Sequence, residues 1–275
     1  IVFLVEKNGI KYAMKILKKI DDEELRAKSV KRFKREIKIL TTIEHPGVVK
    51  IIEYNLDDPE SSPYIVMEYV KGEPLSRLIK VGGMSINDRL AVIRQIADIL
   101  AIIHKNKIIH RDVKPENIII NETGNVKITD FGISRLCSGT YTFTEDIAGS
   151  PLYMAPESFD ATKDPGPESD VFSLGIVAYE LITGKHPFEG ESIPQISEAI
   201  TRKFPARPSK LVQGLPLWVE DMLAKMIAKK PSDRLTAPGI VKCIDHYLGG
   251  SSEPSVTTIT AKILKSMLFV KRDWS

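Results

Sequence analysis

The sequence predicts an α+β fold in which a small, strand-rich N-terminal part precedes a larger, mainly helical part. Two observations carry this prediction. Short β-leaning apolar runs separated by turn signals occupy the first 70 residues, whereas apolar residues at helical spacing dominate from Ser85 onward. The chain has 275 residues and 43% hydrophobic content, which is enough to bury a sizeable core.

The N-terminal strands are predicted from apolar runs at 1–5 and 11–16, which are joined by Lys7-Asn8-Gly9. Asn-Gly between two β-leaning runs is a strong hairpin signal, because both residues tolerate the backbone angles of a tight turn. Further runs at 48–54 and 64–69 continue the sheet. The N-terminal part is therefore expected to be an antiparallel sheet.

One helix is predicted within this sheet region, between residues 22 and 40. The segment is rich in charge, and its apolar residues recur at helical spacing. These residues are Val30, Phe33, Ile37 and Leu40.

The helical part begins at Ser85 and Asp88, which form a capping-box-like start. The helix that follows carries its apolar residues on one face as far as Ile103. The run 171–183 is more uniformly apolar and is closed by Gly184, as expected for a buried helix. Helices at 217–228 and 238–247 complete this part.

The C-terminal end is predicted to be a linker followed by a helix. Residues 249–254 are rich in turn formers, and the apolar residues after them lie at near-helical spacing. These are Ile259, Ile263, Met267 and Val270. We expect a helix that docks on its own domain, with a partner-binding or membrane-proximal segment as the alternative.

The most informative segment is His110-Arg111-Asp112-Val113-Lys114-Pro115-Glu116-Asn117, which is followed by Asp130-Phe131-Gly132. Apolar runs flank an Asn- and Gly-rich turn at 121–125, which predicts a short hairpin that brings Asn117 beside Asp130. Amide and carboxylate oxygens suit Mg²⁺, which uses few protein ligands together with water and phosphate. Asp112 can accept the proton of an attacking hydroxyl, and Lys114 can neutralise charge on a phosphoryl group.

These two segments resemble the catalytic loop and metal-binding motif of eukaryotic-type (Hanks-type) Ser/Thr protein kinases. The resemblance implies a bilobal protein-kinase-like fold, with a small antiparallel sheet lobe carrying one helix and a larger, mainly helical lobe. The expected divisions are 1–70, 71–249 and a linker with helical tail at 250–275. The resemblance also implies ATP and Mg²⁺ as cofactors, with Asn117 and Asp130 as metal ligands.

The nucleotide contacts are implied by the same resemblance. Lys15, in Ala13-Met14-Lys15, matches the strand lysine that contacts the α and β phosphates, and Glu36 matches the helix glutamate that holds this lysine in place. Met67 matches the gatekeeper position beside adenine, and the backbones of Glu68 and Val70 match the groups that pair with the base. The other positions expected around the nucleotide are Val2, Ala13 and Ile119.

Residues 130–157 resemble an activation segment that ends in Ala155-Pro156-Glu157. The resemblance implies a structural pair between Glu157 and Arg234. It also implies that Asp170 ties the catalytic-loop backbone in place, and an N-cap role for Asp170 is the alternative. Ser150 together with Lys114 favours Ser/Thr over Tyr as the acceptor.

Thr142 and Thr144 match twin threonines that bacterial kinases of this type autophosphorylate. Phosphate on these residues is expected to pair with Arg111 and Arg135 and so to order the loop. The expected partners are a protein substrate with a Ser or Thr acceptor and a second copy of the chain during autophosphorylation. The twin threonines also favour a bacterial member of the family.

The chain departs from the family pattern at its start, because the Gly-rich loop that covers the ATP phosphates should end just before Ile1. We therefore expect the sequence to begin inside a kinase domain. This departure favours the alternative of a pseudokinase-like scaffold or inactive fragment. Pseudokinases usually lack one of four residues of the pattern, and all four are present here: Lys15, Asp112, Asn117 and Asp130. A small-molecule phosphotransferase of related fold is a further alternative, but it would not need Ser150 or a braced segment.

Composition bears on which functional classes and cellular locations remain compatible with the sequence. A net charge of +3 argues against a dedicated nucleic-acid binder. Cys137 and Cys243 form neither a disulfide framework nor a metal-ligand pattern, which fits a reducing compartment. No apolar run approaches the length of a membrane span. We expect a cytoplasmic chain, and a membrane-tethered parent protein is compatible with this expectation.

Overall fold

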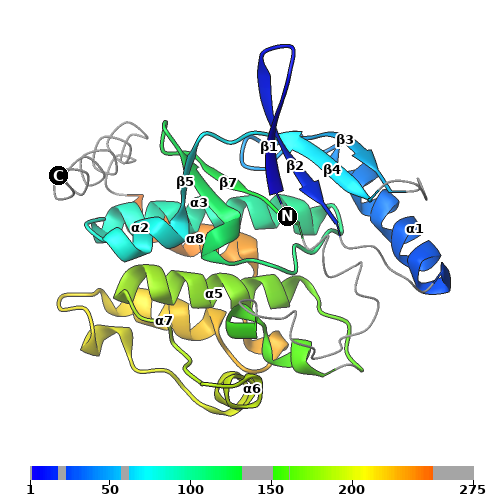
Figure 1. Ribbon diagram of the computed structural model, residues 1–275. Coiled ribbons are helices and arrows are strands. Elements are labelled where there is room, and N and C mark those ends of the chain that lie inside the picture. Colours follow the sequence, from blue (N-terminus) through cyan, green and yellow to red (C-terminus); the bar gives the residue numbers. More distant parts are fainter. Residues whose placement is uncertain (1, 18–22, 57–61, 132–150, 161, 250–275) are drawn as a thin grey trace.

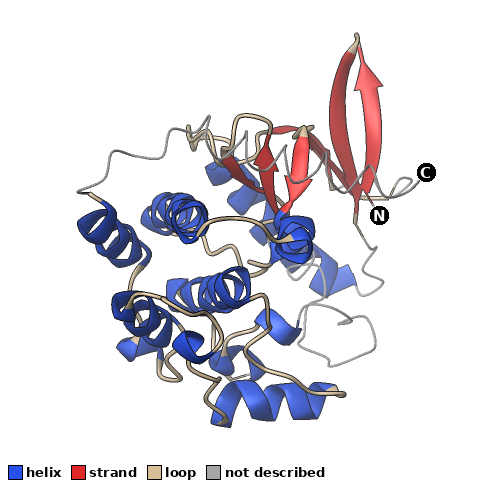
Figure 2. Ribbon diagram, turned by 90° about the vertical axis from the view of Figure 1, so that its left-hand side faces the viewer, coloured by secondary structure: helices blue, strands red, loops and turns tan. Residues whose placement is uncertain are grey.

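The computed structural model of the chain describes residues 2–17, 23–56, 62–131, 151–160 and 162–249 (Figure 1). Within these ranges a small sheet with one helix precedes a mainly helical part, so the predicted α+β class is confirmed. Figure 2 shows the strands gathered at one end and most helices at the other. Thr142, Thr144, Arg135, Ser150 and the tail at 250–275 lie outside the described residues.

The N-terminal sheet has four antiparallel strands in the order β1-β2-β4-β3. The strands are β1 (Val2–Lys7), β2 (Ile10–Ile16), β3 (Ile51–Asn55) and β4 (Tyr64–Glu68). Asn8 and Gly9 connect the first two strands with φ angles of 55° and 77°. Both angles are positive, as a two-residue hairpin turn requires, so the predicted hairpin is confirmed.

Helix α1 (Glu23–Leu40) follows β2 and buries Ile37 and Leu40 in the core. The strand predicted from residue 48 begins only at Ile51, because Val48 instead forms a parallel bridge with Ile128 in the other part of the molecule. A Cβ on Gly47 would lie 2.3 Å from Cδ1 and 2.5 Å from Cγ1 of Ile99, so a larger residue here would require the Ile99 side chain to move. The connection joins the sheet to the helical part.

A second, three-stranded antiparallel sheet holds the predicted catalytic hairpin. Its strands are β5 (Gly72–Pro74), β6 (Ile118–Asn121) and β7 (Val126–Ile128). The side-chain oxygen of Asn121 accepts hydrogen bonds from the N–H groups of Thr123 and Asn125, which closes the turn between β6 and β7. Strand β5 and the short helix α2 (Leu75–Val81) that follows it were not predicted, because both are too short to show periodicity.

The longer helices frame the helical part. They are α3 (Ile86–Lys105), α5 (Pro167–Thr183), α6 (Ile193–Arg202), α7 (Leu217–Met226) and α8 (Ala237–Leu248). The predicted capping box of Ser85 and Asp88 begins α3, and Gly184 ends α5 with a φ of 72°. The N-cap of α5 is Gly166, so the alternative N-cap role for Asp170 is wrong.

Short 3₁₀ turns connect the longer elements of the helical part. They are η1 (Pro115–Asn117), η3 (Pro151–Tyr153), η4 (Pro156–Phe159), η5 (Pro208–Lys210) and η6 (Pro231–Asp233). Each begins with proline, whose fixed φ and missing N–H suit the first position of a helical turn. Across the described ranges, no helix combines the length and apolar character needed to cross a membrane.

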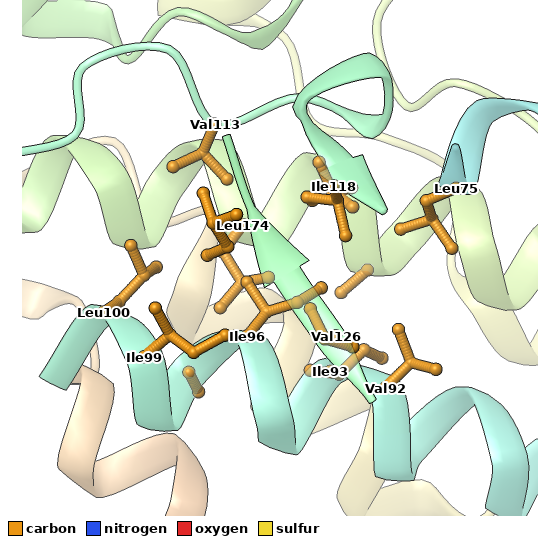
Figure 3. Close-up of a cluster of buried hydrophobic side chains, with 14 of the residues drawn as sticks. Leu75, Val92, Ile93, Ile96, Ile99, Leu100, Val113, Ile118, Val126 and Leu174 are labelled. Carbon is orange, nitrogen blue, oxygen red and sulfur yellow. The ribbon is translucent and has the colours of Figure 1, made fainter. Parts of the chain in front are cut away.

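The main core lies directly beneath the catalytic hairpin. Figure 3 shows Ile118 and Val126 of the hairpin above Ile93 and Ile96 of α3, with Leu174 of α5 in the same cluster. All five side chains are buried. The hairpin therefore rests on two long helices, which limits its movement relative to α5.

Gly175 lies where α5 meets the end of α7, and a Cβ there would be 2.6 Å from Cγ2 of Ile227 and 2.9 Å from Cβ of Met226. Overpacking costs about 1–3 kcal/mol, more than the roughly 1 kcal/mol that alanine gains over glycine in a helix. We expect Gly175→Ala to lower the free energy of unfolding in a urea titration. Gly239→Ala in α8 is the control, because the nearest atom to its Cβ is the Thr236 hydroxyl oxygen at 3.1 Å, a much milder approach. Equal losses in both variants would contradict this packing argument.

Candidate active site

The catalytic loop is held by the buried carboxylate of Asp170, on α5. One carboxylate oxygen accepts a 2.8 Å hydrogen bond from the N–H of Arg111. The other accepts from the N–H of His110 at 2.8 Å and lies 2.8 Å from Nε2 of His104. The predicted tie between Asp170 and the loop backbone is confirmed. The contribution of His104 was not predicted, because nothing in the sequence links the end of α3 to α5.

His110 bonds the loop to the segment before Asp130. Its buried ring packs on Phe131 with ring centres 4.7 Å apart, and its Nε2 lies 3.0 Å from the carbonyl oxygen of Thr129. The N–H of Asp112 donates to its Nδ1 at 3.3 Å. Burial lowers the pKa of His110, so the imidazole is neutral near pH 7, with Nε2 as donor and Nδ1 as acceptor.

Two residues of the site have left-handed backbones. The φ angle is 65° at Arg111 and 57° at Asp130. A non-glycine residue in this region costs roughly 1–3 kcal/mol in the less favourable cases, and such residues collect at functional sites. The hydrogen bonds to Asp170 and the packing of Phe131 are the contacts that hold these two turns.

The structure brings Asp112, Lys114 and Asn117 together around one carboxylate oxygen. Oδ2 of Asp112 lies 2.8 Å from Nζ of Lys114 and accepts a 2.9 Å hydrogen bond from Nδ2 of Asn117. The same amide nitrogen donates to the carbonyl oxygen of Asp112 at 2.8 Å. Both bonds use the nitrogen of Asn117, so its side-chain oxygen is the atom available to a metal ion.

The hairpin places Asn117 beside the Asp130 segment, as predicted. The N–H of Thr129 donates to the carbonyl oxygen of Asn117 at 2.9 Å, and β6 pairs with β7 from Ile118 opposite Ile128. A carboxylate and an amide oxygen are few ligands, but they suit Mg²⁺, which completes its shell with water and phosphate. Among the residues that the structure describes, no group of three or more His, Cys, Asp or Glu side chains could hold a metal ion.

Lys15 reaches this end of the hairpin, where its Nζ lies 2.9 Å from Oδ1 of Asp130. Both side chains are largely buried. Glu36 instead lies 3.6 Å from Nη1 of Arg111. In this structure Lys15 and Glu36 thus pair with Asp130 and Arg111 and not with each other, which differs from the expected contact. The position of α1 relative to the catalytic loop, which spacing along the chain does not give, determines which cation Glu36 meets.

The expected adenine positions lie along β1, β2, β4 and β6, with Val70 just after the end of β4. Ala13 is opposite Met67 in the sheet register, and the Met67 side chain is buried. Ile119 is half-buried on β6, and Val70 packs against the core. Val2 lies on β1, opposite Lys15 of β2. It is 54% exposed, so it would cover the nucleotide region only at its solvent-facing edge.

Glu68 has contacts that the sequence did not predict. Its N–H donates to the carbonyl oxygen of Lys50 at 2.9 Å, so a base could meet the Glu68 backbone only at its carbonyl oxygen. Its carboxylate lies 2.6 Å from Nζ of Lys127, on β7. This ion pair connects the end of β4 to the catalytic hairpin across a long sequence separation.

Glu157 and Arg234 form the predicted structural pair. Two parallel 2.7 Å hydrogen bonds join them, and the hydroxyl of Ser169 donates to Glu157 at 2.6 Å. Arg234 is 7% exposed and also donates to the carbonyl oxygen of Ala228 at 2.8 Å. Burial acts to raise the pKa of Glu157, but the hydrogen bonds from Arg234 and Ser169 outweigh it and hold that pKa below its usual value.

Removing one partner of this pair should lower the free energy of unfolding much more than replacing both partners. Arg234→Met leaves the Glu157 carboxylate buried without its cation, which typically costs about 3–5 kcal/mol of unfolding free energy. We expect the double variant Glu157→Leu/Arg234→Met to be more stable than Arg234→Met alone in a denaturant titration. Additive losses would contradict a direct pair.

The Glu157–Arg234 pair also makes the stability of the folded state depend on pH. The pKa of Glu157 is lowered in the folded state, so its stabilising effect is present above the unfolded pKa and is lost as pH falls through the lower folded value. The stability difference between the wild type and Glu157→Gln should therefore narrow in acid.

Comparison with known proteins identifies the family to which the chain belongs. The sequence model of the protein kinase domain family matches residues 2–246. Serine/threonine-protein kinase PrkC of Bacillus subtilis is 39% identical over 210 residues, which is 74% of this chain and 32% of that protein. A probable serine/threonine-protein kinase of Clostridium perfringens, CPE1738, is 35% identical over 248 residues, which is 89% of this chain and 35% of that protein.

Serine/threonine-protein kinase PknA of Mycobacterium tuberculosis is 34% identical over 238 residues, which is 84% of this chain and 53% of that protein. The chain thus spans between about a third and about a half of the length of these relatives. The family match covers nearly the whole described region, including every site residue discussed above. The chain therefore belongs to the protein kinase domain family and is homologous to bacterial Hanks-type Ser/Thr kinases.

Proposed function

We propose that this chain transfers the γ-phosphoryl group of Mg-ATP to Ser or Thr hydroxyls of protein substrates. One observation carries the proposal: Lys114 and Asn117 converge on a single carboxylate oxygen of Asp112, at 2.8 and 2.9 Å. The Lys15–Asp130 pair lies at the adjacent end of the same hairpin. The proposed base, its neighbouring cation and the two proposed metal ligands therefore lie on one loop and at one end of one hairpin.

Asp112 acts in this proposal on the acceptor hydroxyl. Its carboxylate orients the hydroxyl and accepts its proton as the oxygen attacks phosphorus. Lys114 is close enough to Asp112 to lie beside the transferred group, where its positive charge offsets charge on the phosphoryl oxygens. The strained turn at Arg111 and the bonds to Asp170 fix the loop in advance of the reaction.

The side-chain oxygens of Asn117 and Asp130 would hold magnesium. When bound, Mg²⁺ neutralises charge on the phosphate oxygens of the nucleotide. Lys15 would contribute a second positive charge at the phosphates. Ala13, Met67, Val70 and Ile119 would form apolar surroundings for the base.

Features of the chain favour this proposal over the alternatives. A pseudokinase-like scaffold would not need the Asp112 cluster together with the Lys15–Asp130 pair. A small-molecule phosphotransferase would not need the buried Glu157–Arg234 brace after the activation segment. The names of the relatives, which are serine/threonine-protein kinases, support a Ser or Thr acceptor.

Asp112→Asn removes the proposed base, and general-base catalysis is worth roughly 10² to 10⁴ in rate. We expect labelled phosphate transfer from Mg-ATP to a generic basic protein to fall by about this factor, with an unchanged circular dichroism spectrum. Asp221→Asn, at an exposed position on α7, is the matched control. The assay is run on this chain and on an N-terminally extended form. Undiminished turnover by Asp112→Asn would remove Asp112 from the mechanism.

Regulation by activation-loop phosphorylation belongs to the same proposal and rests on the sequence resemblance alone. Incubation with Mg-ATP should place phosphate on Thr142 or Thr144, as read by mass spectrometry of proteolytic peptides. Thr123→Ala, on the exposed turn between β6 and β7, is the control and should leave the modification pattern unchanged. If neither threonine gains phosphate in an active preparation, this regulatory assignment is wrong.

A further inference from the structure

A cavity of about 400 Å³ lies in the helical part, between α2, the first turn of α3, the end of α5 and residues 211–213. Figure 1 shows α5 passing beneath α2 in this region. None of the residues that line the cavity belongs to the candidate active site. Its volume falls within the roughly 300–1,000 Å³ that small-molecule binding sites occupy. The cavity is therefore large enough for a ligand of its own.

Arg89, in the first turn of α3, is the one charged residue among those that line the cavity. Its Nε donates a 3.0 Å hydrogen bond to the carbonyl oxygen of Met84, and its Nη1 donates a 2.6 Å bond to that of Ile182. Met84 precedes α3 and Ile182 lies in the last turn of α5, and both residues also line the cavity. The guanidinium is therefore fixed in the cavity wall from two sides.

The positive charge of Arg89 has no counter-ion in the described part of the chain. Its third guanidinium nitrogen, Nη2, bonds to no described residue and is open to solvent. No carboxylate of a described residue forms an ion pair with Arg89, and burial lowers its pKa without an opposing effect from an acidic neighbour. By contrast, Arg94 on the same helix is paired with the carboxylate of Asp245.

Arginine stays protonated in proteins, so the cavity wall carries a fixed positive charge with an unused donor. A half-buried charge has lost part of its hydration, and an anion placed beside it restores part of that free energy. The cavity should therefore favour an anionic ligand over a neutral one.

The rest of the lining indicates what kind of anion fits. Gln213 carries an amide that can donate a neutral hydrogen bond. Most apolar side chains of the lining are buried, but Ile79 is only half-buried and Leu211 is 37% exposed. This mixture of polar and apolar surface suits an anion with a short apolar body. Arg89 supplies a single positive charge, which balances a carboxylate but would leave a phosphate dianion only half neutralised.

We propose that this cavity binds a small organic carboxylate, whose oxygens accept hydrogen bonds from Nη2 of Arg89 and whose apolar part contacts Ile79 and Leu211. The bonds to Met84 and Ile182 hold the guanidinium in place beforehand, so binding does not have to order a long side chain. The ligand would contact α2 and the end of α5 at once. This site is separate from the proposed phosphoryl transfer and does not rest on it.

The test compares hexanoate with hexanamide, its uncharged amide of the same length, on the unmodified chain. Isothermal titration calorimetry at fixed ionic strength measures the dissociation constant of each probe. We expect hexanoate to bind about tenfold or more tightly than hexanamide, because hydrogen bonds between charged groups are stronger than neutral ones. Inorganic phosphate is the third probe, and we expect it to bind more weakly than hexanoate.

Two variants locate the binding. Leu211→Trp fills the cavity from its rim and leaves the bonds of Arg89 in place, so it should weaken hexanoate binding by about tenfold or more. Leu217→Trp, at a 74% exposed position on α7, is the matched control and should leave binding unchanged. Arg89→Met removes the charge and should abolish the preference for hexanoate over hexanamide.

Circular dichroism confirms that each variant is folded before binding is compared, and the comparison of probes on the unmodified chain needs no variant. Equal affinities for hexanoate and hexanamide, or undetectable binding of hexanoate, would overturn the proposal. Hexanoate binding that Leu211→Trp leaves unchanged would overturn it as well, because the probe would then lie elsewhere. Phosphate binding as tight as that of hexanoate would show a general anion site and would overturn the assignment to carboxylates. Each outcome is independent of whether the chain transfers phosphate.

Discussion

The hydrogen bonds that Asp170 accepts are the contacts on which the site depends. This carboxylate lies inside the first turns of α5, a helix buried along almost its whole length, and it receives two main-chain N–H groups of the catalytic loop. A buried carboxylate without donors, or buried N–H groups without an acceptor, would cost several kcal/mol, so helix and loop require each other. The positions of Asp112, Lys114 and Asn117 follow, because they extend from a backbone that α5 holds in place.

A second set of contacts joins this loop to the small sheet. His110 and Phe131 pack against each other, the Ile128 N–H bonds to Gly47, and Lys127 meets Glu68. The last two contacts reach the catalytic hairpin, whereas the first joins the catalytic loop to the segment after the hairpin. The hairpin is therefore the element through which the sheet and the helical part meet. Lys15 and Glu36 belong to the sheet side of this junction. Their ion pairs with Asp130 and Arg111 depend on how α1 and β2 sit relative to the hairpin.

Local features of the fold could be predicted because neighbouring residues determine them. The Asn8-Gly9 hairpin, the Ser85 capping box and the Gly184 helix end each rest on backbone preferences of residues a few positions apart. The catalytic hairpin was predicted for the same reason. The Glu157–Arg234 pair is distant in sequence, and only resemblance to a family anticipated it. Strand β5 and helix α2 were missed, since three and seven residues are too few to show a period.

The sequence by itself determined the family, the α+β class and the identity of the residues that carry the proposed chemistry. The order of the motifs along the chain gives the family and these residues, and patterns among neighbouring residues give the fold class. The tertiary structure decided the partners of those residues. Ion pairs act over a few ångströms, and a shift of one helix exchanges one partner for another. Glu36 therefore meets Arg111 while Lys15 meets Asp130, an outcome that spacing along the chain cannot specify. The octapeptide from His110 to Asn117 supplies the groups of the proposed chemistry, and the buried carboxylate of Asp170 holds their backbone in place.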